Sequence, residues 1–215
     1  MNIVVILTTT VKIQKHITWL EQRCSNVRYK MYEKIISLWL NKTNLNIVVI
    51  ENSGHKFKVP DKFKNRFEMI SFSYSKIPEK DRINLNKMKA KGQHEVYAIQ
   101  YACNHSKIIK NSDFVIKITG RYFIPSLENI LIKNLKSDID AIQQSVLWRK
   151  MNRCEVVGCS SKNIFKLFYF PAKNDMLEQE YMNRIKHLGK ILKLPKMKLH
   201  KKTKQGCGGK ARDFL

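Results

Sequence analysis

The stretch Asp113-Phe-Val-Ile-Lys-Ile-Thr-Gly-Arg-Tyr-Phe-Ile-Pro125 decides the fold expected for this chain. Residues 114–116 and Ile118 have the apolar pattern of a buried, central strand. That strand runs directly into Thr119-Gly120-Arg121-Tyr122. In open α/β sheets, ligands bind outside the carboxyl ends of the strands. A glycine, a fixed cation and an aromatic residue are therefore expected at the edge of the sheet where a ligand would bind.

An anionic ligand, such as the diphosphate of a nucleotide, could bind well to this segment. Arg121 offers charge-assisted hydrogen bonds, and Gly120 allows a close approach to the backbone. A strand that ends in an ordinary turn would show the same pattern. The residues alone leave both interpretations open.

Strand and helix patterns alternate along most of the chain. Buried apolar runs predict strands at residues 2–7, 46–50, 67–74, 114–118, 139–143 and 156–159. Apolar residues at helical spacing predict helices at residues 13–39, 95–106, 127–135, 163–170 and 176–188. A polar, Lys-rich loop is expected at residues 76–90. This alternation indicates an α/β fold with a mostly parallel central sheet flanked by helices.

The chain is strongly basic, with 41 Lys and Arg residues against 17 Asp and Glu residues and a net charge of +24. Lys far outnumbers Arg, and Asn and Ile are abundant, as in the proteins of AT-rich genomes, so much of this charge is expected on solvated surface. Nucleic-acid binders more often use Arg for bidentate contacts. We therefore expect an anionic partner but no specific nucleic acid, and keep a basic nucleic-acid-binding protein as the alternative.

At 215 residues, the chain is long enough for one domain with a substantial core. No apolar run approaches the ~20 residues that span a bilayer, and the first residues do not resemble a signal peptide. The five cysteines are expected to be reduced thiols. These features predict a cytoplasmic protein.

The composition changes beyond Lys186, where Lys and Arg become dominant. We predict a domain of residues 1–185 followed by a basic C-terminal tail of residues 186–215. Such a tail usually stays in water, although it could fold back over a site or hold the protein at an anionic membrane surface.

The order of these patterns, with Lys91-Gly92-x-x-Glu95 and Lys117-Ile-Thr-Gly-Arg-Tyr122, resembles the nucleotide-binding half of a GT-A glycosyltransferase. The resemblance is to small glycosyltransferase-like proteins of large DNA viruses and of bacterial surface-polysaccharide loci. It implies a single GT-A-like, Rossmann-like domain that transfers a hexose or pentose from a UDP- or GDP-sugar to a glycan or lipid-linked acceptor. A viral member would work in the host cytoplasm. A transferase-fold protein without activity is a further alternative.

The resemblance also implies roles for individual residues. Thr8 and Thr10 would lie beside the nucleotide, and Glu51, at the end of the second strand, would contact its base or ribose. Lys91 and Gly92 would approach the diphosphate, where the amides of a helix N-terminus favour negative charge. The remaining nucleotide-sugar contacts would come from Lys117, Thr119, Gly120, Arg121 and Tyr122.

GT-A enzymes usually carry Asp-x-Asp where this chain has residues 117–122, and that motif holds a divalent cation on the diphosphate. Here the strand end offers cations. We hypothesise that Arg121, Lys91 and the basic tail stabilise the departing diphosphate without a metal. Mg²⁺ or Mn²⁺ is the alternative cofactor, because Asp138-Ile139-Asp140 opens the following strand with suitable ligands. Two edge residues around a core Ile would give the same pattern.

An inverting sugar transfer needs a carboxylate that takes the proton of the acceptor hydroxyl. In GT-A enzymes this acid comes late in the chain, near the start of a helix, where this sequence has Asp175, Glu178 and Glu180. We rank Glu178 first and pair it with Arg121 as the catalytic residues. Acidic residues in the first turn of a helix also complement its dipole, which is the structural alternative.

Overall fold

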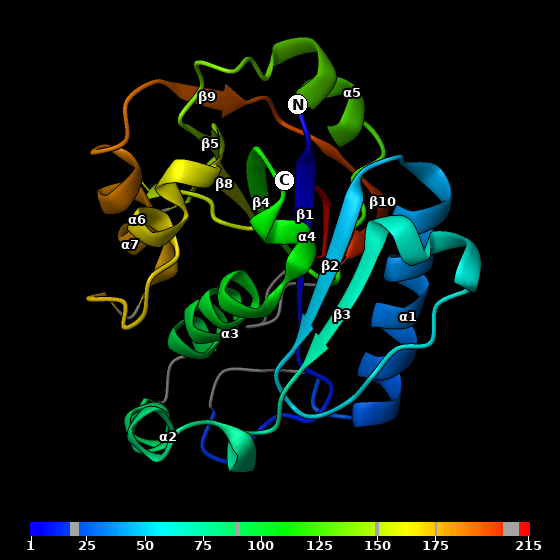
Figure 1. Ribbon diagram of the computed structural model, residues 1–215, viewed down its shortest axis with the longest axis vertical. Helices are drawn as coiled ribbons and strands as arrows, with labels where there is room; N and C mark the ends of the chain where they lie inside the picture. Colours follow the sequence, from blue (N-terminus) through cyan, green and yellow to red (C-terminus); the bar gives the residue numbers. More distant parts are fainter. Residues whose placement is uncertain (18–21, 89–90, 149–150, 175, 204–210) are drawn as a thin grey trace.

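The computed structural model describes residues 1–17, 22–88, 91–148, 151–174, 176–203 and 211–215. Within these residues, one central sheet of seven strands has the order β3-β2-β1-β4-β8-β5-β9 (Figure 1). Its strands are β1 (Ile3–Thr9), β2 (Asn46–Glu51), β3 (Phe67–Ser71), β4 (Phe114–Thr119), β5 (Ala141–Gln144), β8 (Val156–Ser160) and β9 (Ile191–Leu194). All neighbours are parallel except that β8 runs antiparallel to β4 and β5. The predicted α/β class with a mostly parallel sheet is confirmed.

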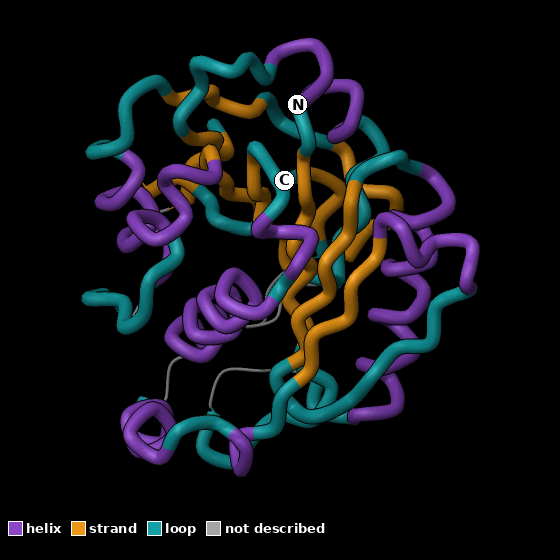
Figure 2. Tube along the Cα trace, viewed as in Figure 1, coloured by secondary structure: helices purple, strands orange, loops and turns teal. Residues whose placement is uncertain are grey.

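Helices cover both faces of this sheet (Figures 1 and 2). One face packs against α1 (Ser25–Lys42) and α5 (Leu127–Asn134). The other packs against α3 (Lys91–His105), α6 (Ile164–Leu167) and α7 (Leu177–Ile185). The remaining elements are α2 (Glu79–Lys87), α4 (Lys107–Lys110), the 3₁₀ turns η1 (Asp61–Arg66), η2 (Tyr74–Lys76) and η3 (Ser161–Asn163), and the short strands β6 (Leu147–Trp148), β7 (Met151–Asn152), β10 (Lys198–Thr203) and β11 (Arg212–Phe214).

The strand sequences explain the two layers. Side chains alternate between the faces of a sheet, so a strand covered on both faces must be apolar throughout. In β1, Val4 and Ile6 belong to the core on the α3 face, whereas Val5 and Leu7 belong to the core on the α1 face. The sequence of β4 follows the same rule except at Lys117, which is buried on the α3 side.

The first predicted helix is too long. It was expected at residues 13–39, but the described part of that stretch becomes helical only at Ser25. The backbone before it is held by side chains at the end of β2: Val11 donates its N–H to Glu51 at 2.9 Å, and Lys12 donates to Ser53 at 2.9 Å. These tertiary hydrogen bonds outweigh the local helical spacing.

Two further predictions, for residues 67–74 and 76–90, need correction. The strand predicted at residues 67–74 ends at Ser71. The loop expected at residues 76–90 contains α2, a polar helix in which Leu85 is the buried residue. A short helix with so few apolar residues shows no clear periodicity in its sequence.

The described part of residues 186–215 is folded and does not form a solvated tail. β9 joins the central sheet as an edge strand, and β10 pairs with β11. Met197, Leu199 and Leu215 are buried in the core on the α1 face. Between residues 193 and 199, the buried Leu194, Met197 and Leu199 alternate with lysines that are exposed to water. Residues 206–209 lie outside the described residues.

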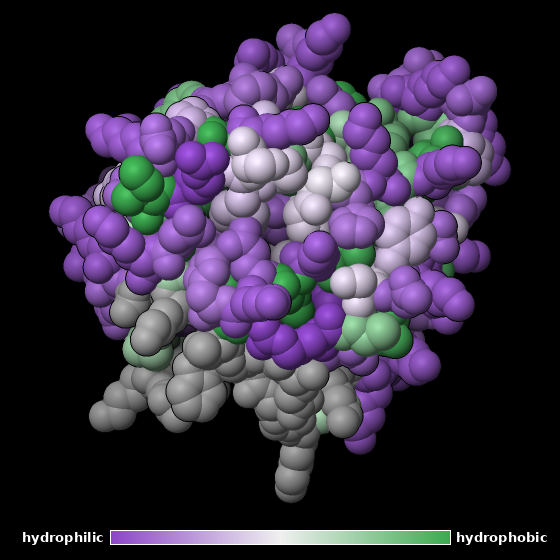
Figure 3. Space-filling model, turned by 90° about the horizontal axis from the view of Figure 1, so that it is seen from below, coloured by the Kyte–Doolittle hydropathy of each residue, from purple (hydrophilic) through white to green (hydrophobic). Residues whose placement is uncertain are grey.

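The parallel strands bring their carboxyl ends to one edge of the sheet, which points downward in Figure 1 and faces the viewer in Figure 3. We call this the carboxyl edge. Its surface is mostly hydrophilic where Figure 3 shows described residues. Among the described residues, none of the helices combines the length and the apolar character needed to cross a membrane.

Candidate functional site

A buried ion pair lies at the carboxyl edge between β4 and α3. Lys117 Nζ is 2.9 Å from Glu95 Oε1, and the Lys117 side chain is only 1% exposed. The same Glu95 oxygen accepts a hydrogen bond from Thr8 Oγ1 at 2.7 Å. Lys117 also donates to the carbonyl of Cys154 at 2.8 Å and to Thr119 Oγ1 at 3.3 Å. The pair thus joins the ends of β1 and β4 to the first turns of α3.

Both members of this pair are charged. Burial disfavours the ammonium group, but Glu95 outweighs burial and raises the pKa of Lys117. Burial likewise disfavours the Glu95 carboxylate, but Lys117, Thr8 and Lys91 together lower its pKa. The second oxygen of Glu95, Oε2, has no partner among the described residues, and 21% of this side chain is exposed. Glu95 therefore presents an ionised oxygen at the edge of the sheet.

Gly120 is required by the packing of the two strand ends. Its N–H donates to the Thr8 carbonyl at 3.0 Å, and a Cβ at position 120 would lie 2.6 Å from that oxygen. A side chain at position 120 would force β1 and β4 apart. The close approach here is between two strands, and the expected approach of a ligand to Gly120 stays a prediction.

Two arginines stand side by side without a carboxylate partner among the described residues. Arg28, from α1, is buried and donates to the Thr10 carbonyl at 2.6 Å and to the Tyr32 hydroxyl at 2.6 Å. Burial lowers the pKa of Arg28; Tyr32 opposes this effect and Arg121 adds to it. Arg121 stacks over Tyr122 at 5.3 Å, and its Nε atom is buried without a hydrogen-bond partner. The carboxylate of Glu51 partly offsets the charge of Arg28, since it raises the Arg28 pKa. The remaining positive charge of the two arginines favours an anionic ligand.

The carboxylates near these arginines are already engaged. Glu51 is fully buried and accepts from the N–H groups of Val11 at 2.9 Å, Ser53 at 2.9 Å and His55 at 2.7 Å. Glu51 therefore orders the loops after β1 and β2. Its expected contact with a base or ribose stays a prediction.

Buried polar atoms without a partner concentrate at the carboxyl edge. Within the described residues, such atoms belong to His16, Asn52, Ser71, Arg121, Gln144, Glu155 and Tyr181. Each of these residues ends a strand that points to this edge, begins β8 there, or faces it from a loop or helix. Leaving a buried polar group unpaired costs about 1–3 kcal/mol. These groups are spread along the edge, from Ser71 at the end of β3 to Gln144 at the end of β5, and each is a candidate contact for a polar ligand.

Several of these residues carry no recognisable signal in the sequence. His16, Asn52 and Tyr181 lie in segments whose sequences carry no motif, and Arg28 is one cation among many in a basic chain. A signal did exist for the ion pair: a lysine inside an apolar strand must find a partner when it is buried. The partner, Glu95, stands in the other motif that the sequence singles out.

The three candidate bases have different surroundings. Glu180 is buried and bonded to Arg184 at 2.6 Å and to the Asn174 N–H at 3.0 Å, so it holds the loop before α7. Glu178 is half-buried, has no hydrogen bond or ion pair with another described residue, and is close enough to Cys154 to help burial raise the pKa of that thiol. Asp175 lies outside the described residues. Glu178 is thus the available carboxylate of this helix.

The Asp-Ile-Asp motif lies at the opposite edge of the sheet. Asp138 and Asp140 precede β5 and are 2.7 Å from Lys190 Nζ and 2.8 Å from Lys162 Nζ, respectively. These lysines lower the pKa of both carboxyl groups. Ile139, between them, is part of the core.

Two carboxylates of the carboxyl edge, Glu95 and Glu155, are held by cations in the described part of the chain. Glu95 is paired with Lys117, and Glu155 is paired with Arg153 at 2.6 Å. An ammonium or guanidinium group this close opposes the binding of Mg²⁺ or Mn²⁺ by the same carboxylate. No group of three or more His, Cys, Asp and Glu residues that could hold a metal occurs in the described part of the chain.

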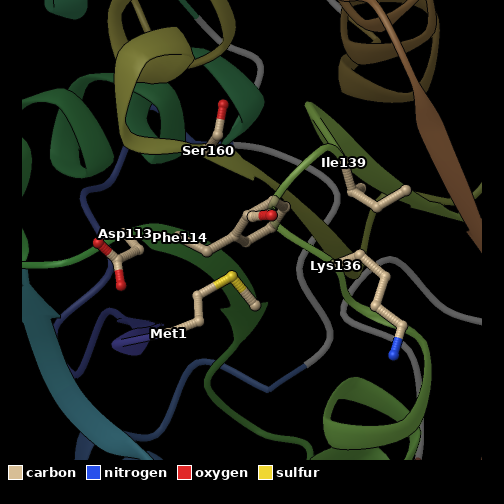
Figure 4. Close-up of a pocket in the computed structure, with 7 residues that line it drawn as sticks. Met1, Asp113, Phe114, Lys136, Ile139 and Ser160 are labelled. Carbon is tan, nitrogen blue, oxygen red and sulfur yellow. The ribbon is translucent and has the colours of Figure 1, made fainter.

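A pocket of about 390 Å³ lies at the amino edge of the sheet, away from the residues described above. It is lined by Met1, Asp113, Phe114, Lys136, Ser137, Ile139 and Ser160 (Figure 4). Asp113 accepts a hydrogen bond from the Asn2 N–H at 2.6 Å, and Ser160 accepts one from Asn163 at 3.1 Å. These polar side chains have partners, unlike those of the carboxyl edge.

No model of a protein family matches this sequence, and no curated protein matches it. Solved structures with a similar arrangement include a glycosyltransferase involved in glycosylation of the major capsid of PBCV-1, with 8% identity, a TM-score of 0.48, and 90% of this chain and 82% of that chain covered. A galactosyltransferase in complex with donor and acceptor sugar analogs has 12% identity and a TM-score of 0.48, and the match covers 90% of this chain and 73% of that chain. A cytidylyltransferase from Leptospira borgpetersenii has 12% identity, a TM-score of 0.45, and coverage of 91% and 76%. Function does not follow from a likeness at this level.

Proposed function

We propose that this protein is a glycosyltransferase that moves a sugar from a UDP- or GDP-sugar to a glycan or lipid-linked acceptor. The observation that carries the proposal is the concentration of unpaired buried polar atoms at the carboxyl edge. A nucleotide sugar has a base, a diphosphate and several hydroxyl groups, so one extended ligand could pair with many of them. The carboxyl edge is also where open α/β sheets bind nucleotides.

The diphosphate would bind near the positive side chains of Arg121, Arg28 and Lys91. Arg121 and Arg28 have no carboxylate partner among the described residues, and Lys91 begins α3 beside Glu95. During transfer, the bond between the anomeric carbon and the diphosphate oxygen breaks, and negative charge develops on that oxygen. Fixed cations that are already in place stabilise this charge without reorganising.

Glu178 is the proposed general base. The acceptor hydroxyl loses its proton as its oxygen bonds to the anomeric carbon, and a carboxylate within reach accepts that proton. Glu178 is half-buried on the first turn of α7 and has no partner among the described residues that would hold it in another role. This assignment corresponds to an inverting transfer.

We also propose that the transfer does not require a divalent cation. Among the described residues, Glu95 and Glu155 are paired with cations and Glu51 accepts from backbone N–H groups, so the diphosphate would meet positive side chains instead. We place the activity in the cytoplasm, with contact to anionic membrane where the acceptor is lipid-linked.

A ligand panel tests the proposal. We expect one of UDP, GDP and their common sugars to raise the melting temperature, because a ligand that binds only the folded state stabilises it by mass action. The same nucleotide sugar should be turned over to the free nucleotide diphosphate. The rival function, nucleic-acid binding, predicts no shift with any nucleotide and a salt-sensitive gel shift with DNA.

A further inference from the structure

Tyr181 of α7 has an unpaired polar atom that the proposed chemistry does not use. Its side chain is 1% exposed, and its hydroxyl has no hydrogen-bond partner among the described residues. Most buried tyrosine hydroxyls find a partner. The ring is held by Phe168, whose centroid lies 6.0 Å away in an edge-to-face arrangement. The hydroxyl therefore lacks the partner that burial requires.

The Tyr181 hydroxyl lies near the ion pair. Tyr181 and the elements α3, α6 and α7 belong to the same core, on the face of the sheet where Lys117 and Glu95 meet. Burial raises the pKa of Tyr181, and the nearby Glu95 and Cys154 raise it further. Cys154 is itself bonded through its carbonyl to Lys117. The segment before α7 is also tied to the first turn of α3, since Ala172 donates its N–H to Gln93 at 3.0 Å and Asn174 donates to Glu180 at 3.0 Å. Glu95 and Tyr181 therefore lie on two helices that are joined at this end.

We propose that Glu95 and Tyr181 bind hydroxyl groups of the transferred sugar. In this arrangement the ligand-facing oxygen of Glu95 accepts a hydrogen bond from one hydroxyl, and the phenol of Tyr181 donates to a neighbouring hydroxyl. The inference rests on the proposed function and adds a class of substrate to it. The donor is a nucleotide sugar whose ring keeps its hydroxyl groups at the two contacted positions.

The chemistry of Glu95 favours this role over two others. A general base works best when its pKa lies near the working pH, and Lys117 holds the pKa of Glu95 below its ordinary value. The same ammonium group, 2.9 Å away, opposes a divalent cation on this carboxylate. An ionised carboxylate oxygen that neither takes a proton nor binds a metal remains a strong hydrogen-bond acceptor.

Binding requires that the Tyr181 hydroxyl be uncovered when the sugar enters. Glu95 provides the entry, since 21% of its side chain is exposed. Glu178 lies on the same helix as Tyr181, three residues earlier, and is half-buried. Changes of side-chain rotamer are common when a ligand binds, and a small movement at this end of α7 would expose the phenol.

The test compares Tyr181→Phe with Tyr97→Phe. Tyr97 is a matched control because it is also buried, but its hydroxyl has a partner, Asp81, at 3.0 Å. Each variant is measured by calorimetry with UDP, GDP, and UDP- and GDP-hexoses. We expect Tyr181→Phe to keep the affinity for the nucleotide diphosphate. Its affinity for the nucleotide sugar should fall about fivefold to tenfold, the effect of one lost hydrogen bond. Tyr97→Phe should change neither affinity.

Stability gives a second readout that separates a binding role from a structural one. Removing an unpaired buried hydroxyl should leave the melting temperature of Tyr181→Phe equal to or above that of the wild type. Removing the Tyr97 hydroxyl, which is bonded to Asp81, should lower the melting temperature of Tyr97→Phe. A destabilised Tyr181→Phe with unchanged sugar affinity would overturn the inference.

Fluorodeoxy donors test Glu95 by comparing two donors on the same protein. Fluorine cannot donate a hydrogen bond, so the analogue lacking the contacted hydroxyl should bind the wild type about tenfold more weakly than its parent sugar. Glu95→Gln should bind the two donors with nearly equal affinity. Equal discrimination by both proteins at every ring position would overturn the role of Glu95. If nucleotides bind but no variant changes the affinity for the sugar, this inference is refuted and the proposed nucleotide site is retained. If no nucleotide binds, the proposed function itself is refuted.

Discussion

The ammonium nitrogen of Lys117 lies 2.9 Å from Glu95 Oε1, and this contact joins the two motifs that the sequence separates by more than twenty residues. Lys117 belongs to the strand segment, and Glu95 belongs to Lys91-Gly92-x-x-Glu95. Thr8 adds the end of β1 to the same oxygen. The pair fixes the position of α3 relative to the centre of the sheet and brings the charged residues of the site together.

Breaking this pair should destabilise the protein. Lys117→Met leaves Glu95 without its cation in a largely buried place, and loss of one partner of such a pair costs about 3–5 kcal/mol. The control is Lys162→Met, because Lys162 pairs with Asp140 on the surface with 72% of its side chain exposed, and such pairs contribute at most about 1 kcal/mol. Urea unfolding of both variants measures the difference. Equal effects would show that the Lys117 pair contributes no more than a surface pair.

The buried strands and the long helices were predictable because their sequences have clear periodicity. Lys117 was among the predicted site residues, and its pairing with Glu95 could not be predicted because it depends on two strands and a helix meeting in space. α2 was missed because its residues are mostly polar, and β9–β11 were missed because lysines obscure their buried residues. Tyr181 and Asn52 could not be predicted as site residues, because what marks them is a buried polar atom without a partner among the described residues. No local sequence pattern encodes this property.

The pH dependence of stability should include a contribution from His94. Its ring accepts from or donates to Tyr74 at 2.5 Å and contacts the Met88 carbonyl at 3.0 Å. Burial lowers the pKa of His94; the Met88 carbonyl opposes this effect and His16 adds to it. The unfolded state therefore takes up the proton first, and stability is lost as the pH falls from about 6.5 towards the lower pKa of the folded state.

His94→Gln removes this titration. We expect unfolding free energies of the wild type to fall between about pH 7 and pH 5 and those of His94→Gln to fall less over the same range. His187→Gln changes an exposed histidine and serves as the control. Parallel pH profiles for wild type and His94→Gln would contradict the assignment.

Substitution of Glu178 should affect turnover, whereas substitution of Glu180 should affect stability. Glu178→Gln is expected to lower kcat by a factor of about 10²–10⁴, the usual contribution of a general base, while the melting temperature stays unchanged. Glu180→Gln should lower the melting temperature because Glu180 is bonded to Arg184 in a buried pair at 2.6 Å. Most of the turnover remaining in Glu178→Gln would rule out this residue as the base.

A chelator should leave the transfer intact. The proposed transition-state charge is stabilised by Arg121, Arg28 and Lys91, so turnover after dialysis against EDTA should remain near the untreated rate. Readdition of Mg²⁺ or Mn²⁺ provides the control for incomplete removal. Complete loss of turnover with EDTA and recovery with either ion would refute the metal-free version.

The central claim is that the carboxyl edge binds a nucleotide diphosphate through Arg121, and calorimetric titration of UDP- and GDP-sugars into wild type and Arg121→Ala tests it most directly. Arg82→Gln is the control, since Arg82 contacts Glu79 on the surface. The account predicts that at least one donor binds the wild type and Arg82→Gln alike, and binds Arg121→Ala about tenfold to a hundredfold more weakly, the effect of losing hydrogen bonds to a charged group. Equal affinity of that donor for wild type and Arg121→Ala, or no binding of any donor to the wild type, would contradict it.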